Sequence, residues 1–321
     1  MDSSRCLCVA LVLLAAFLPP ATVAARTVDS PGEARLVTTD LARFWRVWEA
    51  HDGRPGADAL QAGYLDPGTA GLQAFLALRI GSARELAETI AAHPGYYASL
   101  RGVGEGVEDQ RAAFHAAFEA LEALYPPAVF PDTYFLIGRM NSAGTLSDEG
   151  LLIGLDMHGR QPGVDLSGLS PWHQGVLARP RDLPRIVSHE LVHYQQSGGA
   201  AQPTLLQQSV REGSADFIAE RIAGGHINAL AHRHGLRHEC DLWREFEPRM
   251  AGTDYSGFLY GGDGAGDRPA DLGYFIGYRI VQSYVERHGL SEATLRAVLG
   301  GVDAANLLRE GGYAPCGGGG G

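Results

Sequence analysis

Two of the histidines in the sequence, His189 and His193, stand four positions apart, and Glu190 directly follows the first. This spacing puts both imidazoles on one face only in an α-helix, where such residues lie about 5–6 Å apart at Cβ. Two imidazoles so placed can reach one Zn²⁺, and the glutamate can accept a proton from a water on the metal. We therefore expect a partly buried helix over 184–197 with a zinc site on one face. The alternative for the pair alone is two buried histidines within the core.

A catalytic zinc site needs a third protein ligand and keeps one coordination position open. Glu212 stands nineteen residues after His193 and opens a second stretch with helical spacing of apolar residues. A turn near residues 197–199 would bring this second helix back beside the first. Asp216 lies one turn further along, and metal-bound histidines usually donate their second N–H to a carboxylate. We expect Glu212 to be the third ligand and Asp216 to hold His189; the alternative is a solvated helix face.

This order of motifs resembles the gluzincin branch of zinc metallopeptidases, the thermolysin-like arrangement of H-E-x-x-H followed by E-x-x-x-D. Over about residues 130–290 the chain also resembles bacterial proteins described as predicted zinc-dependent proteases, a family related to gliding-motility lipoproteins. The segments that carry this resemblance are Tyr134-Phe-Leu-Ile-Gly138, Leu152-Ile-Gly154, His189-Glu190, Glu212-Gly-Ser-Ala-Asp216 and Leu272-Gly-Tyr-Phe-Ile-Gly-Tyr278. The resemblance implies a zincin-like fold, zinc at His189, His193 and Glu212, and Glu190 as the general base.

The composition excludes several other chemistries. All 26 basic residues are arginine, so a P-loop lysine, a Schiff-base lysine and a Ser-Lys dyad are absent. The sequence holds no G-x-S-x-G, the motif of a serine hydrolase elbow. The net charge of −11 argues against a nucleic-acid partner, because phosphate binding needs clustered cations. The partner that we expect is a peptide or protein substrate.

Residues 1–25 have the pattern of a secretory signal peptide, with Arg5, an apolar run over 7–18 and small residues at the expected cleavage site. The run is short for a membrane span, which takes about 20 residues; the alternative is an uncleaved anchor. Because no second run of spanning length occurs, we expect no membrane span in the mature chain. The expected location is the periplasm or the extracellular space.

Cleavage would leave two cysteines, Cys240 and Cys316, in an oxidising compartment. One disulfide between them would tie the C-terminal tail to the body of the protein. Two unpaired thiols are the alternative.

The spacing of apolar residues predicts a mainly helical α+β fold with a small central sheet. Two short apolar runs, 133–138 and 151–155, read as strands. The expected helices are 34–50, 69–79, 83–92, 109–124, 184–197, 205–223, 240–250, 270–288 and 291–299. The expected organisation is a signal peptide over 1–25, a helical N-terminal part over 26–130, a zincin-like catalytic part over 131–316 and a glycine tail over 317–321. The catalytic part is expected to contain the small central sheet, the active-site helix and the Glu-bearing helix that follows it.

Two further clusters have the residue types of metal ligands. The first is a histidine run with a cysteine, which is either a second metal site or a charged helix end: His232, His234, His238 and Cys240. The second is Asp263 and Asp267 among glycines, which is either a calcium site or a mobile loop.

Substrate handling needs an edge strand and an extra hydrogen-bond donor. Extended peptides bind along an edge strand, for which the candidates are 151–156 or the segment just before it, with a loop over 139–149 at the rim of the cleft. Tyr274 and Tyr278 lie one helical turn apart, and either phenol can donate to an oxyanion. Aromatic packing is the alternative for both.

The function that these patterns favour is an exported zinc metallopeptidase. A non-enzymatic zinc-binding envelope protein and a zinc amidase that acts on cell-wall peptides are the alternatives. A purely structural zinc site has no need of Glu190, and more often fills its fourth position with cysteine or histidine.

Overall fold

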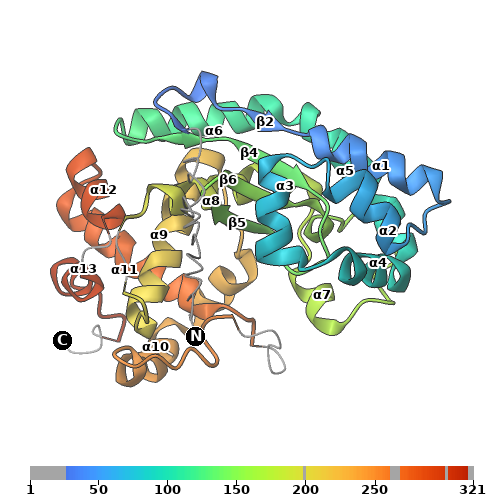
Figure 1. Ribbon diagram of the computed structural model, residues 1–321. Coiled ribbons are helices and arrows are strands. Elements are labelled where there is room, and N and C mark those ends of the chain that lie inside the picture. Colours follow the sequence, from blue (N-terminus) through green and yellow to red (C-terminus); the bar gives the residue numbers. More distant parts are fainter. Residues whose placement is uncertain (1–26, 198–199, 261–267, 301–302, 317–321) are drawn as a thin grey trace, which may run out of the picture.

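The computed structural model describes residues 27–197, 200–260, 268–300 and 303–316, and it is mainly helical with a small sheet, as the sequence predicts (Figure 1). The helices are α1 Thr39–Ala50, α2 Ala57–Leu60, α3 Ala70–Phe75, α4 Ala83–Ala92, α5 Pro94–Asp109, α6 Arg111–Leu124, α7 Pro171–Val176, α8 Leu183–Gln195, α9 Leu205–Ala223, α10 Ala229–Phe246, α11 Leu272–His288, α12 Glu292–Leu299 and α13 Ala304–Gly311. The strands are β1 Thr27–Val28, β2 Leu36–Val37, β3 Phe130–Pro131, β4 Thr133–Leu136, β5 Gly144–Ser147 and β6 Gly150–Gly154.

Several predicted features lie outside the described residues. They are the signal peptide over 1–25, the glycines at 198–199 of the predicted turn, Asp263 and Asp267, and the tail over 317–321. Within the described residues, no helix combines the length and apolar character needed to cross a membrane.

The main sheet has four strands in the order β2-β4-β6-β5. β2, β4 and β6 run parallel, with Tyr134 of β4 opposite Leu152 of β6, and β5 pairs antiparallel with β6. Every residue of β4 and β6 is buried, which matches their continuous apolar sequence, because helices cover both faces of such strands. β5 therefore forms one free edge of the sheet. A separate pair, β1 and β3, is antiparallel.

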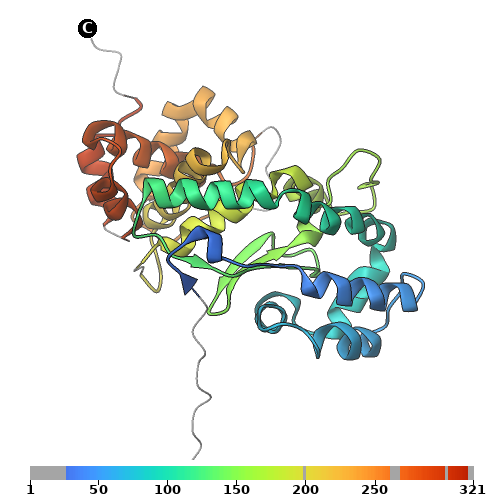
Figure 2. The ribbon, with the colours of Figure 1, turned by 90° about the horizontal axis from the view of Figure 1, so that it is seen from above.

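Helices pack on the sheet from both ends of the sequence. α1 and α3 contact β4, α8 contacts β5 and β6, and α6 contacts both α8 and α9. Figures 1 and 2 show α9 to α13 gathered at one end of the molecule and α1 to α4 at the other, with the sheet and α8 between them. The sheet edge at β5 and the helix α8 consequently meet in the middle of the molecule.

Two glycines let α9 and α11 cross at very short range. A Cβ at Gly213 would overlap the backbone of Tyr278, and a Cβ at Gly277 would overlap the carbonyl of Ser209. Larger residues at either position would force the helices apart. This crossing fixes the rotation of α9, so that the face opposite Gly213 turns toward α8.

The predicted elements agree with the structure where apolar spacing is strong and differ where it is weak. The predicted helices over 83–92 and 205–223 coincide with α4 and α9. α10 is kinked at His238, whose φ of −126° and ψ of 21° are not helical, and the helix predicted from residue 240 corresponds to the segment after this kink, whereas the segment from Ala229 to the kink was not predicted. The buried face of its first half consists of Ala231, His232 and Gly235, with Gly235 against the ring of Phe275, so no large apolar residue marks it in the sequence.

Other differences concern short elements and one missed helix. The helix predicted from residue 34 begins at Thr39, since Leu36 and Val37 form β2. α5 precedes the predicted helix over 109–124, and the break between α5 and α6 falls at Gln110. α2, α7 and α13 were not predicted.

The two cysteines are joined in a disulfide and are not free thiols. Cys240 of α10 is bonded to Cys316, seventy-six residues later in the chain. The bond ties the C-terminal segment to α10.

Candidate metal centre

The helix α8 carries the H-E-x-x-H motif in the predicted conformation. Pro184 stands in its first turn, where the missing N–H costs no hydrogen bond. His189 and His193 lie one turn apart and are both buried, and their Nε2 atoms are 3.0 Å from each other. Leu191 and Val192, between them, point into the core. The motif therefore presents two imidazoles to a single point.

The helix α9 brings Glu212 and Asp216 to the same place. A capping box of Thr204 and Gln207 fixes the start of this helix. Glu212 Oε2 lies 3.0 Å from His193 Nε2 and 3.4 Å from His189 Nε2. The three side chains His189, His193 and Glu212 form the group of potential metal ligands found in the described part of the chain. The sequence-predicted triad is thus brought together.

The geometry of this triad fits a zinc ion. Tetrahedral coordination with bonds of about 2.0–2.1 Å places neighbouring ligand atoms about 3.3 Å apart. The three donor atoms lie 3.0 to 3.4 Å from one another. Two histidines and one carboxylate also form a donor set known from catalytic zinc sites that keep one position open.

The hydrogen bond behind His193 leaves its Nε2 atom to face the centre. Gln196 Nε2 donates to the carbonyl of Arg211 and to Ser214 Oγ, so the carbonyl oxygen of its side chain faces His193. That oxygen lies 2.7 Å from His193 Nδ1, which must therefore carry a proton. His193 thus presents the lone pair of Nε2 to the centre.

Asp216 faces Nδ1 of His189, as Gln196 faces Nδ1 of His193. Its Oδ1 atom lies 2.9 Å from His189 Nδ1, and the side chain is fully buried. Its Oδ2 atom lies 3.5 Å from His232 Nε2 and accepts a hydrogen bond from Asn228 at 3.4 Å. Asp216 is placed as predicted, and it faces two histidines at once.

Without a metal, the charges of the centre compensate one another. Burial opposes ionisation of Glu212, but the two histidines hold its pKa well below the usual value. Burial alone lowers the pKa of His189, yet contact with Asp216 and Glu212 raises it to about 10. Burial likewise opposes ionisation of Asp216, and contact with His189 and His232 lowers its pKa. A metal bound to Nε2 of His189 would have to displace a proton.

Glu190 lies against the edge strand β5. An added Cβ at Gly144 would come within 2.5 Å of Glu190 Oε1, so the glycine leaves the space that the carboxylate occupies. Within the described residues, the Glu190 carboxylate has no hydrogen-bond or ion-pair partner. No other side chain of the described residues therefore neutralises this carboxylate.

The position of β5 corrects part of the prediction on the edge strand. Residues 151–156 do not form an edge, because β6 lies between β4 and β5. The segment just before it supplies the edge strand, within the region predicted as the loop over 139–149. Among the described strands, β5 is the outer strand that contacts α8.

Two residues that the sequence did not predict, Tyr260 and Gln208, hold the second oxygen of Glu212. The Tyr260 hydroxyl donates to Glu212 Oε1 at 2.9 Å, and Gln208 Nε2 donates to the same atom at 3.0 Å. Gln208 also donates to the Tyr260 hydroxyl at 2.6 Å. Oε2 is therefore the oxygen left for a metal. Gln208 precedes Glu212 by one helical turn, a spacing that could have identified it; no sequence signal marks Tyr260.

The two predicted tyrosines of α11 have different surroundings. The ring of Tyr274 stacks on that of His189, with centroids 6.1 Å apart and planes 19° apart. The Tyr278 hydroxyl instead donates to Glu220 Oε2 at 2.5 Å, and its ring contacts His226 and His232. The structure brings Tyr274 to the metal centre and Tyr278 to the next turn of α9.

The second histidine cluster does not form a metal site. His232 is buried against Asp216 and stacks on His226, with ring centroids 3.7 Å apart. His234 and His238 contact each other elsewhere on α10, and Cys240 is in the disulfide. The run spans the kink of α10 at His238, where the first helical segment ends.

Comparison with protein families gives one match. Residues 176–299 match the family described as "Predicted Zn-dependent protease (DUF2268)". The matched stretch contains α8 and α9, and with them all three residues of the triad. Searches of curated proteins and of solved structures found no match.

Proposed function

We propose that the protein is an exported zinc metallopeptidase that hydrolyses peptide bonds at the centre formed by α8 and α9, next to the edge strand β5. The observation that carries this proposal is the convergence of three buried donor atoms beside a carboxylate, that of Glu190, which has no partner in the described residues. The family match over 176–299 supports the same conclusion. A structural zinc site does not require an unpaired carboxylate at this position.

His189, His193 and Glu212 would hold the zinc, with Asp216 and Gln196 orienting the two imidazoles. Zinc bound there would lower the pKa of its water to about 7 and polarise a carbonyl oxygen. Glu190 would accept the proton of the attacking water and pass it to the leaving amine. The backbone of β5 would hold the substrate in extended form.

Two phenols at the centre are candidates to stabilise the oxyanion that develops on the scissile carbonyl. Tyr260 already directs its hydroxyl at Glu212 Oε1, and Tyr274 stacks on His189. Of the two, we propose Tyr260 as the donor, because its hydroxyl lies within hydrogen-bonding distance of a ligand residue. Tyr278, which the sequence also suggested, is bonded to Glu220.

Export is the part of the proposal that depends on the N-terminus. The signal-like pattern of residues 1–25 indicates secretion, and the disulfide between Cys240 and Cys316 is typical of an oxidising compartment. Both observations favour the periplasm or the extracellular space.

The substitution Glu190→Gln tests the proposal. We expect the variant to retain about one zinc per chain and to lose about 10²–10⁴-fold in hydrolysis of a peptide library, the usual contribution of a general base. Glu119→Gln, the same change on the exposed face of α6, is the matched control and should keep full activity.

The outcomes separate the candidate functions. Hydrolysis of peptides that is lost on Glu190→Gln supports the peptidase. Hydrolysis of cell-wall peptides alone would favour the amidase. Zinc retained by both proteins with no hydrolysis of either substrate class would contradict the enzyme and favour a zinc-binding envelope protein.

A further inference from the structure

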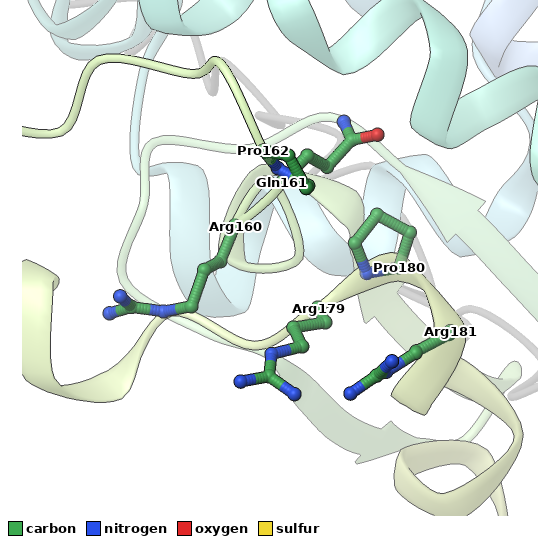
Figure 3. A pocket seen from close by; sticks show the side chains of 6 residues that line it. All are labelled: Arg160, Gln161, Pro162, Arg179, Pro180 and Arg181. Carbon is green, nitrogen blue, oxygen red and sulfur yellow. The ribbon is translucent and has the colours of Figure 1, made fainter.

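A hollow of about 530 Å³ lies just before the start of α8 in the chain. Two short segments line it, 160–162 and 179–181, and we call it the arginine hollow (Figure 3). Its lining residues are Arg160, Gln161, Pro162, Arg179, Pro180 and Arg181. The volume lies within the range of sites that bind small molecules, about 300–1,000 Å³. None of the proposed zinc ligands lines it.

The hollow concentrates positive charge without a countercharge. Three of its six lining residues are arginines and none is acidic. Most arginines in the described part of the chain form ion pairs, but these three form none there. The nearest acidic residues in the sequence are already engaged, Asp182 with Arg185 at 2.8 Å and Asp165 with the backbone N–H of Ser167. In a chain of net charge −11, such a cluster is suited to an anion.

The frame of the hollow is held by backbone hydrogen bonds. Arg160 N donates to Ala178 O at 3.1 Å and Ala178 N donates to Met157 O at 2.8 Å, which joins the two segments. The Arg160 guanidinium donates to the carbonyls of Leu177 and Gln174. These bonds fix Arg160 before any ligand binds, which reduces the entropy cost of binding.

Figure 3 shows the three guanidinium groups pointing to the same side, while Gln161 points away from them. Proline fixes φ at one value, and Pro180 lies between Arg179 and Arg181. The two arginines are thus carried on a stiff segment at the start of α8. All three positively charged side chains therefore line the same hollow.

We propose that the arginine hollow binds a phosphate group, either as the free ion or as a phosphomonoester. The guanidinium groups of Arg179 and Arg181 each offer a planar fork of N–H donors that matches phosphate oxygens, and Arg160, whose Nε and one Nη donate to backbone carbonyls, adds its remaining N–H groups and its charge. A tetrahedral dianion can accept hydrogen bonds from several forks at once, whereas a carboxylate has one charge and two oxygens. The volume leaves room for an organic group next to the phosphate. This site is separate from the metal centre and does not depend on the peptidase function.

Calorimetric titration of the whole protein with inorganic phosphate and with glycerol 3-phosphate, at matched ionic strength near 0.15 M, tests the proposal. We expect binding with Kd below about 1 mM for at least one of them. The variants Arg179→Gln and Arg181→Gln should each weaken it about tenfold or more, because each removes charged hydrogen bonds. Arg237→Gln is the matched control: Arg237 is an exposed arginine on α10 outside the hollow, and its replacement should leave the affinity unchanged.

The two ligands distinguish the source of the phosphate. Tighter binding of glycerol 3-phosphate indicates an organic monoester, and tighter binding of the inorganic ion indicates free phosphate. The same titration after removal of metal by a chelator separates the hollow from the metal centre. Absence of binding, binding that the Arg179 and Arg181 variants leave unchanged, or binding that disappears with the metal would each overturn the proposal.

Discussion

At the scale of single residues, Asp216 connects the metal centre to the rest of the helical core. One carboxylate oxygen faces His189 and the other faces His232 and Asn228. The ion pair with Asp216 at Nδ1 orients the His189 ring so that Nε2 faces the centre. Second partners of this kind typically contribute about 10–100-fold to metal affinity.

We therefore predict that Asp216→Asn weakens zinc binding by about 10–100-fold, measured by competition with a chromophoric chelator. Glu220→Gln is the control, since Glu220 lies one turn later on α9 and contacts His226 and Tyr278 instead of a proposed ligand. Equal zinc affinity of Asp216→Asn and the unmodified protein would show that Asp216 does not support the site.

Tyr260 gives a second prediction at this scale. If its hydroxyl stabilises the oxyanion, Tyr260→Phe should lower kcat by about 10²–10³-fold when measured at saturating zinc, which separates this effect from the lost hydrogen bond to Glu212. Tyr274→Phe tests the other phenol at the centre. Tyr278→Phe serves as the control, because the Tyr278 hydroxyl is bonded to Glu220. A normal kcat for Tyr260→Phe would show that the Tyr260 hydroxyl does not stabilise the oxyanion.

The sequence predicted those site residues whose relation is local. His189, Glu190 and His193 follow from the geometry of one helix, and so does the spacing of Glu212 and Asp216 on the next. Tyr260 stands forty-eight residues after Glu212 and reaches it only through the tertiary fold. No periodicity in the sequence encodes such a contact.

At the scale of elements, the position of the edge strand depends on a buried carboxylate. Asp156 follows β6 and accepts hydrogen bonds from the backbone N–H groups of Gly138 and Met140, at 2.6 and 2.5 Å. These bonds hold the segment that leads from β4 to β5. Burial raises the pKa of Asp156 to about 6, although the same hydrogen bonds oppose the shift.

The pKa of Asp156 predicts a pH dependence of stability. Because the folded protein binds this proton more tightly than the unfolded chain, the stabilising contribution is complete below about pH 4 and is lost as the pH rises through 6. The expected loss is on the order of 3 kcal/mol. Urea unfolding from pH 4 to 7 should show this loss in the unmodified protein relative to Asp156→Asn. Parallel pH profiles of the two proteins would contradict it.

The sequence predicted those elements that have a strong apolar pattern, and the two central strands are among them. It did not predict β5, because Gly144-Thr-Leu-Ser147 is short and half-buried and pairs with β6 along one side only. It placed α11 correctly, but the different surroundings of Tyr274 and Tyr278 arise from the crossing with α9 at Gly213 and Gly277. A crossing of two helices is a property of their packing and cannot be derived from either helix alone.

At the scale of the whole molecule, segments from both halves of the chain support the sheet and the helices that carry the triad. β2, before residue 40, pairs with β4, and α6 packs on the two helices that carry the triad. The division into parts at residue 130 stays a prediction. The mainly helical α+β class was predicted correctly, because composition and periodicity reflect the whole chain.

The central claim is that His189, His193 and Glu212 together hold one zinc ion. The most direct test is a crystal structure of the protein grown with zinc, with anomalous diffraction measured at the zinc absorption edge. The account predicts one strong anomalous peak about 2.0–2.2 Å from Nε2 of both histidines and from Oε2 of the glutamate. The absence of a peak there, or a single peak at another position such as the histidine run of α10, would contradict it.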